Sequence, residues 1–370
     1  MKSQKTILSL ALLLAMNLNA VQLRAEAQQA SSANKTNVAL SYQIGHPITN
    51  GNLAVFLIHG ADKLKNKEYL TLTEGLARKQ IVVKETSDVN TLKIDNLSNA
   101  VVFIQSGQIV KGGKQDRALQ SDMLIQPQAK GVSLPCFCVE QGRWSGRGGE
   151  SPQQFNSSSN FVVGNEMNLA VKKDRDQSKV WSQVETKQKQ LSRSLKKEIA
   201  PAASPTSMQL TLEQKDVQGA VASQVNALAN VVEKETDVIG YAVAINGKVS
   251  HADVYASGTL FKKLWPGLLK SAVVEAVAQK GAPAKKAPTE GEVKAILTAA
   301  ATAKPEPSLP YAAAPRLQGA TSGSLGAQGN DASYVSGVNT AGSVRQSKSS
   351  WFFRTNDTKG GFVHENYIGK

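Results

Sequence analysis

Short apolar runs separated by turn residues fill the N-terminal half of the chain. Residues 52–59 (NLAVFLIH) form a compact apolar run that ends at Gly60 and is typical of a buried strand. Further along, the runs become closely spaced, with turn residues such as Gly112 and Gly113 between them. These runs are 81–85, 91–97, 101–105, 108–110, 118–127 and 132–140. The spacing predicts an antiparallel sandwich or a barrel-like unit.

The apolar period changes to that of helices after a Gly/Ser-rich loop at residues 142–159. Residues 176–199 and 210–235 place valine and leucine at helical spacing, which predicts two amphipathic helices. A third helix is predicted after Thr259, which can cap it. Pro266 is expected to break or kink the first turns of this helix.

The clearest local signal predicts a β-hairpin. Residues 238–245 alternate between the two faces of a strand, and residues 248–255 return as a second strand. Between them, Asn246 and Gly247 are the residue types that accept the two positive-φ positions of a type I′ turn.

Composition changes again after the third helix. Residues 281–344 are rich in Ala, Pro, Gly and Ser, which predicts a flexible linker. One part of this linker is expected to be helical, because Thr289 and Glu292 have the spacing of a capping box. Aromatic and β-branched residues return in residues 345–370, so the C-terminal tail is predicted to dock as a strand.

The predicted fold class is therefore α+β. A β-rich half at residues 45–145 and an α/β half at residues 160–280 together form one domain, 45–280, followed by the linker and the docking tail.

The N-terminus has the pattern of a secretory signal peptide. Two lysines precede an apolar run that is too short to span a bilayer, and residues 25–27 (AEA) offer a cleavage site, with an earlier one at Asn19-Ala20. We expect a signal peptide at residues 1–27 and a polar leader at 28–44; an uncleaved membrane anchor is the alternative. Since no later segment is apolar enough to span a membrane, the mature protein is expected in the periplasm or outside the cell.

A basic excess narrows the range of partners. The formal net charge is +14, and residues 1–27 hold three basic residues and one acidic residue, so the mature chain keeps +12. This balance favours an anionic small molecule or an acidic surface, and a partner protein is also possible. Part of the excess lies in residues 172–198, where such a run is most often the solvated face of a helix. Nucleic acid is disfavoured because aromatic residues are sparse and export separates the protein from most of it.

The chain has two cysteines, Cys136 and Cys138, too few for a disulfide framework. Residues two apart on a strand point to one face, which makes a bond between them awkward and favours two buried thiols.

Three blocks of this sequence resemble a known family. YLTLTEGLARKQIVVKE at 69–85, the segment from VFIQSGQIVKGGKQDR to CVEQGRWS at 102–145, and VIGYAVAINGKVSHADVYASGTLFKKLWPGLL at 238–269 are similar to the ARG and rhodanese-phosphatase-superfamily-associated protein domain. The resemblance covers about residues 45–280 and extends to the HENYI segment near the C-terminus. It implies no established activity, and the family name points to ADP-ribose and phosphate chemistry only through the domains found alongside it.

The stretch GGKQDR carries the first candidate site. Two glycines permit a tight turn with exposed N–H groups, and Lys114 and Arg117 add cationic donors that suit a carboxylate or phosphate. Gln115 and Asp116 are placed to orient those donors.

A second polar block follows the next strand, so the two blocks are expected at one end of the sheet. Glu140 is the candidate general acid or base, and Trp144 offers a stacking surface beside Gln141 and Arg143.

The alternative interpretation is structural. Lys114 or Arg117 could pair with Glu140, and Asp116 with Arg143, in a buried network that only holds the loops closed. An open cleft lined by these side chains would favour binding or catalysis, whereas mutual pairing would favour the structural interpretation.

No motif in the sequence predicts a cofactor. The four histidines, including His59 at a strand end, lack metal-ligand spacing, so we expect no metal site. Nucleotide-binding and serine-hydrolase motifs are also absent. The leading hypothesis is an exported, non-catalytic module that binds an anionic ligand or a partner protein. The alternative is a hydrolase acting on a phosphate- or sugar-containing, ADP-ribose-like substrate.

Overall fold

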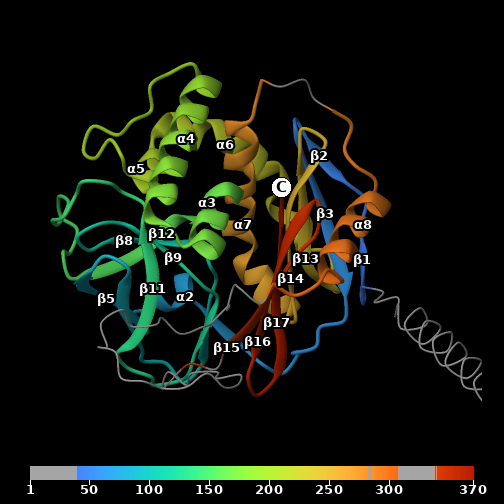
Figure 1. Ribbon diagram of the computed structural model, residues 1–370, viewed down its shortest axis with the longest axis horizontal. Coiled ribbons are helices and arrows are strands. Elements are labelled where there is room, and N and C mark those ends of the chain that lie inside the picture. The colour runs from blue at the N-terminus through green and yellow to red at the C-terminus, as the bar shows by residue number, and fades with distance from the viewer. Residues whose placement is uncertain (1–39, 282–284, 307–337, 339) are drawn as a thin grey trace, which may run out of the picture. The chain divides into compact units, whose positions relative to one another are not determined.

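Strands of the N-terminal half close into an antiparallel barrel (Figure 1). The computed structural model describes residues 40–281, 285–306, 338 and 340–370, without the side chains of 159–162. The barrel strands, in spatial order, are β11 (Val132–Cys138), β6 (Thr91–Asn96), β5 (Ile81–Asp88), β12 (Gln154–Val162), β8 (Gln108–Gly112) and β9 (Arg117–Leu119). Closure depends on β11, whose first residues pair with β6 and whose last residues, Cys136 to Cys138, pair with β9.

One barrel strand lies where the sequence predicts a loop. β12 begins at Gln154, and six of its nine residues lie inside the polar stretch 142–159. Its Phe155 is buried in the barrel core with Val83 and Val110, and this packing replaces the apolar alternation that the strand lacks.

A smaller sheet lies beside the barrel. Its spatial order is β10 (Met123–Ile125), β7 (Val101–Ile104) and β4 (Tyr69–Thr71), with β4 parallel to β7. Helix α2 (Leu72–Ala77) follows β4 directly, because Thr71 and Glu74 form a capping box at its start.

The second half of the chain contributes most of an eight-stranded sheet. The predicted hairpin is present as β13 (Val238–Ile245) and β14 (Lys248–Tyr255), and Asn246 and Gly247 have the positive φ values, 51° and 76°, that the turn requires. The order is β1 (Tyr42–Ile44), β3 (Leu53–Gly60), β13, β14, β17 (Gly361–Gly369), β16 (Ser350–Asp357) and β15 (Thr340–Gln346), with β2 (Ile48–Asn50) also paired to β3.

The helices include one long, buried element. The chain runs through α3 (Asn165–Leu169), a π-helical turn (Ala170–Asp174), α4 (Gln177–Leu195), α5 (Met208–Glu213), α6 (Lys215–Leu228) and a 3-10 turn (Ala229–Val232), and later through α7 (Gly258–Ala278) and α8 (Glu290–Ala301). Figure 1 shows α7 between the barrel and the large sheet, and it packs against β12 on one side and β13 on the other.

Two sequence expectations for α7, the cap at Thr259 and a break at Pro266, are wrong. Ser257 rather than Thr259 caps the helix, accepting a hydrogen bond from the Leu260 N–H at 3.2 Å. Pro266 does not break the helix, which continues to Ala278. Its ring is exposed, while the turns on either side bury Trp265 and Leu268, so packing outweighs the loss of one backbone hydrogen bond.

The region after α7 holds more structure than a linker and one strand. The helix predicted from Thr289 and Glu292 is confirmed as α8, with both capping-box hydrogen bonds. Three strands, not one, follow: β15 begins inside the predicted linker, and β16 and β17 continue the large sheet. The described residues from 41 onward group as one compact unit. The predicted signal peptide, most of the polar leader and linker residues 307–337 lie outside the described residues.

The predicted α+β class, with a barrel in the N-terminal half, is confirmed. Within the described residues, no helix is both long and apolar enough to span a membrane.

Candidate functional site

The two polar blocks lie together at one end of the barrel. Register places Cys138 of β11 opposite Arg117 of β9, so the chain leaving β11 meets the loop entering β9. The Asp116 N–H donates to Glu140 Oε2 at 3.2 Å, and Gln115 Nε2 donates to the Glu140 carbonyl at 2.8 Å.

The first block is a tight turn because of its glycines. Gly112 and Gly113 have φ values of 123° and 56°. A Cβ at Gly113 would also lie 2.1 Å from the ring of Phe155, so only glycine fits above this barrel residue. The Gly112 N–H donates to Asp116 Oδ1 at 3.0 Å and fixes the carboxylate over the turn.

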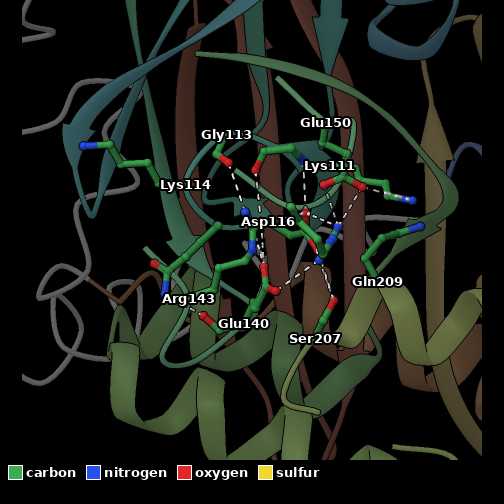
Figure 2. A network of polar contacts seen from close by, with 12 residues as sticks. Lys111, Gly113, Lys114, Asp116, Glu140, Arg143, Glu150, Ser207 and Gln209 are labelled. Atoms are coloured by element: carbon green, nitrogen blue, oxygen red, sulfur yellow. Dashed lines mark hydrogen bonds and ion pairs between the residues drawn. The ribbon is translucent and has the colours of Figure 1, made fainter. Parts of the chain in front are cut away.

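Two arginines, Arg143 and Arg147, close over the Asp116 and Glu140 carboxylates and form an arginine–carboxylate network with them. Figure 2 labels Asp116, Glu140 and Arg143 within this network. Arg143 Nη2 lies 2.6 Å from Glu140 Oε2, and Arg147 Nη1 lies 3.0 Å from both Asp116 Oδ2 and Glu140 Oε1. Both carboxylates have no exposed surface. The network is therefore closed to solvent on its acidic side.

Burial and pairing move the two carboxyl groups in opposite directions. Burial and the charge of Glu140 raise the pKa of Asp116, although Arg147 opposes them. Burial also acts to raise the pKa of Glu140, but the hydrogen bonds from Arg143, Ser204 and the Asp116 N–H, together with the charge of Arg143, outweigh burial and hold that pKa below its usual value. Glu140 is therefore a charged partner of two arginines and has no proton to donate at neutral pH.

Arg147 is the member of this network that the sequence did not reveal. It lies in the Gly/Ser-rich stretch, which resembles a linker. It also contacts Glu150 at 3.0 Å and Ser207 at 3.4 Å. Ser207 caps α5 and donates to Asp116 Oδ2 at 3.1 Å, so the network ties the barrel loops to the first turn of that helix.

The remaining residues of the two blocks have other partners than expected. Arg117 is buried and lies 3.6 Å from Glu85, and Lys114 Nζ donates to Ser87 Oγ at 2.9 Å, so neither pairs with Glu140. Figure 2 shows Lys114 extending away from the network. The predicted contact between Asp116 and Arg143 is present at 3.6 Å.

Two further residues lie at the rim. Trp144 is 44% exposed, with Lys114 Nζ 5.1 Å and Arg117 Cζ 5.7 Å from its ring centroid. The exposed Gln141 contributes its carbonyl, which accepts from Thr206 Oγ1 at 2.6 Å. The charged groups of both blocks thus pair mainly with one another and with neighbouring strands.

A cationic groove of about 780 Å³ opens beside α6 and α7. Lys263 and Lys270 of α7 line it, and the described lining residues include no aspartate or glutamate. The rest of the lining is hydroxyl, amide and apolar: Thr71, Thr73, Ser157, Ser158, Gln218, Val221, Ala222, Val225, Asn226, Leu264, Pro266 and Gly267.

The two groove lysines differ in their hydrogen-bond and ion-pair partners. Lys263 Nζ donates to the Tyr69 carbonyl at 3.1 Å and lies 3.7 Å from Glu74. Lys270 forms no hydrogen bond or ion pair with any described residue. Burial lowers the pKa of Lys270, although the charge of Glu213 opposes this.

Polar contacts connect the groove with the arginine–carboxylate network. Ser158 of the groove wall donates to Gln209, which donates to Glu213 at 2.8 Å. Glu213 pairs with Lys111 at 2.7 Å, and Lys111 lies 3.5 Å from Glu150, the partner of Arg147. The network therefore supports one wall of the groove. Nothing in the local sequence marks Lys270 as a site residue, because the groove forms only when α6 packs on α7.

The cysteines are buried thiols, as expected. Burial raises the pKa of Cys138 to about 11 and that of Cys136 further, so both stay protonated at neutral pH. Gln115 Oε1 accepts a hydrogen bond from Cys138 Sγ at 2.9 Å.

A partly exposed group of possible metal ligands lies elsewhere, at the end of β3. His59 Nδ1 is 2.9 Å from Asp237, and Glu235 places a carboxylate oxygen within 4.8 Å of both. Among the described residues, these three side chains form the one group of at least three His, Cys, Asp or Glu whose possible ligand atoms all lie within 4.8 Å of one another.

The sequence model of the ARG and rhodanese-phosphatase-superfamily-associated protein domain matches residues 41–332, well over half of the chain. The chain belongs to this family. The matched range begins with β1 and ends before β15, so HENYI lies outside it. No curated protein matches the chain, and neither does any solved structure.

Proposed function

We propose that this member of the family is an exported, non-catalytic module that binds an anionic small molecule in the cationic groove. The observation that carries the proposal is the charge of the lining: two lysines, with no acidic side chain among the described lining residues. A half-buried cation without an ion-pair partner is partly dehydrated, and an anionic ligand would supply the missing interaction. Lys270 is such a cation.

The rest of the lining suits a phosphorylated or carboxylated molecule with hydroxyl groups. Thr73 and Ser157 offer hydroxyl groups to such a molecule, and Gln218 and Asn226 offer side-chain amides. The apolar side chains between them would contact the uncharged part of the ligand. A volume of about 780 Å³ lies in the range of small-molecule sites.

The non-catalytic part of the proposal is supported by the arginine–carboxylate network. Glu140, the residue expected to act in the hydrolase hypothesis, is fully buried and paired with two arginines. The four members instead hold the loops and α5, and through Glu150 and Lys111 they support the groove.

Binding is tested by isothermal titration calorimetry with inorganic phosphate and ADP-ribose as probes. We expect saturable binding of at least one probe, and Lys270→Gln should weaken it by about tenfold, the loss of roughly one charge-assisted hydrogen bond. Lys248→Gln removes a lysine that is exposed in the hairpin and serves as the matched control. Binding that is absent, or that both variants weaken equally, would exclude the groove as the site.

Export is tested separately, by fractionation and N-terminal sequencing of the protein from its native host. Export predicts a mature protein that begins near residue 28 or at the earlier cleavage site. A chain that retains its first residues in the cytoplasm would contradict this part of the proposal.

A further inference from the structure

The cationic groove has one lysine whose charge is not compensated by a described residue. Lys263 is compensated, because its Nζ donates to the Tyr69 carbonyl at 3.1 Å and lies 3.7 Å from Glu74. Lys270 has no such partner, and the charge of Glu213 acts on it without an ion-pair contact. A ligand that complements the groove therefore needs one negative charge, placed at Lys270.

Several polar groups of the lining are already bonded within the protein. Thr71 belongs to the capping box of α2, Ser158 donates to Gln209, and Gln218 donates to the Leu212 carbonyl. A ligand with many hydroxyl groups would therefore find few partners. The polar lining side chains that form no hydrogen bond with a described residue are those of Thr73, Ser157 and Asn226, besides Lys270.

An aliphatic stripe runs along the groove. On α6 the lining positions 218, 221, 222, 225 and 226 have helical spacing and form one face about 12 Å long, at a rise of about 1.5 Å per residue. Val221 and Leu264 are each 2% exposed and lie deepest, whereas Ala222 and Pro266 are exposed. An alkyl chain lying along this stripe would remove its apolar surface from water.

The lining does not suit a nucleotide base. No aromatic side chain is among the described lining residues, so a base would find no ring on which to stack. A phosphate monoester also carries nearly two negative charges at neutral pH, more than the single charge of Lys270 balances. A carboxylate carries one.

We propose that the groove binds a monocarboxylate with an unbranched alkyl chain, of the kind found in medium-chain fatty acids; this inference rests on the proposed function and specifies its ligand. The carboxylate pairs with Lys270, and the chain lies between α6 and α7. Because the stripe is only about two helical turns long, it fits one free chain rather than the surface of a membrane. Inorganic phosphate would bind more weakly, through its charge alone.

Isothermal titration calorimetry of the full chain with acetate, hexanoate and decanoate tests this inference, with decanoate kept below the concentration at which it forms micelles. The three probes carry the same charge, so differences in affinity report the alkyl chain. Each methylene that becomes buried should tighten binding about threefold to fourfold. This series uses the unaltered protein and does not depend on the folding of any variant.

Two variants locate the binding site. Lys270→Gln should weaken decanoate binding at least tenfold, whereas the matched control Lys248→Gln, in the exposed hairpin, should not change it. Val225→Thr places a hydroxyl group on the half-buried middle of the stripe and should reduce the gain in affinity per methylene.

The outcomes separate this inference from the proposed function. Phosphate binding that depends on Lys270, with no gain from acetate to decanoate, would overturn the carboxylate inference and leave the proposed function standing. No binding of phosphate, ADP-ribose or any carboxylate would overturn both. Decanoate binding that Lys270→Gln leaves unchanged would overturn the inference, because it would place the carboxylate outside the groove.

Discussion

At the scale of single residues, the main feature is that buried charges occur with partners. Glu140 illustrates this, because Arg143 and Arg147 both contact its carboxylate and Asp116 lies beside it. Removing one member of such a network leaves the others buried without compensation. These residues therefore matter first for stability.

The first prediction is that Glu140→Gln lowers the free energy of unfolding by about 3–5 kcal/mol, the usual cost of breaking a buried charge pair. Urea denaturation measures it. Gln141→Ala, at the exposed neighbouring position, should change stability by about 0.5 kcal/mol or less. If Glu140→Gln kept full stability but abolished turnover of a phosphosugar, the hydrolase alternative would replace our proposal.

His364 gives a second prediction, on pH. Its ring lies between Asp122 Oδ2 at 2.7 Å and Asp253 Oδ1 at 3.0 Å, with Thr355 also donating to Asp122. Burial acts to lower the pKa of His364, but the charges of Asp122 and Asp253 and the hydrogen bonds to both carboxylates together outweigh burial and raise that pKa above its usual value. Burial acts to raise the pKa of Asp122, but the charges of Lys172 and His364 outweigh it and lower that pKa.

The direction of the pH dependence follows from the difference in pKa between the folded and unfolded states. The stabilisation by His364 is complete below the unfolded pKa of about 6.5 and is lost as pH rises through the raised folded pKa. The stabilisation by Asp122 is present above its unfolded pKa and is lost as pH falls through the lowered one. We expect the unfolding free energy to fall between pH 6.5 and the raised pKa, and His364→Gln to flatten this dependence. Equal slopes in both proteins would contradict the assignment.

At the scale of elements, local sequence determined some structures and tertiary packing determined others. The alternating strand residues and the turn residues Asn246 and Gly247 predicted the hairpin, and the capping box at Thr289 predicted α8. Both predictions succeeded because these signals act within a few residues. β12 was missed because its polar sequence is recruited by pairing with β5 and β8. The break considered at Pro266 is absent because the energy of burying α7 exceeds the local cost of proline.

The sequence predicted part of the candidate site, and tertiary packing determined the rest. The sequence located both polar blocks at one barrel end, since successive antiparallel strands return loops to the same edge. It did not supply the partners: Arg147 lies in a stretch without periodicity, and Glu85 is distant along the chain from Arg117. The groove depends on contacts between α6, α7 and β12, which are far apart in sequence and which no local pattern encodes.

At the scale of the whole molecule, the third prediction concerns the C-terminus. β17 lies between β14 and β16 in the interior of the large sheet, and carries His364 and Asn366. Deleting residues 361–370 would leave two strands unpaired and Asp253 without its donors. We expect the truncated chain to be insoluble or unfolded by circular dichroism.

The matched control for that truncation is a deletion of residues 312–330, which lie outside the described residues. This control should fold if the predicted linker contributes no core. A folded protein lacking 361–370 would show that β17 is dispensable.

The position of β17 also has a consequence for the order of events in the cell. β17 pairs with β14 on one side and with β16 on the other, so the sheet cannot close until residues 361–369 have been synthesised. The strands made earlier must therefore wait for a partner that is translated long after them. During that interval the open edge of β14 is exposed to other chains.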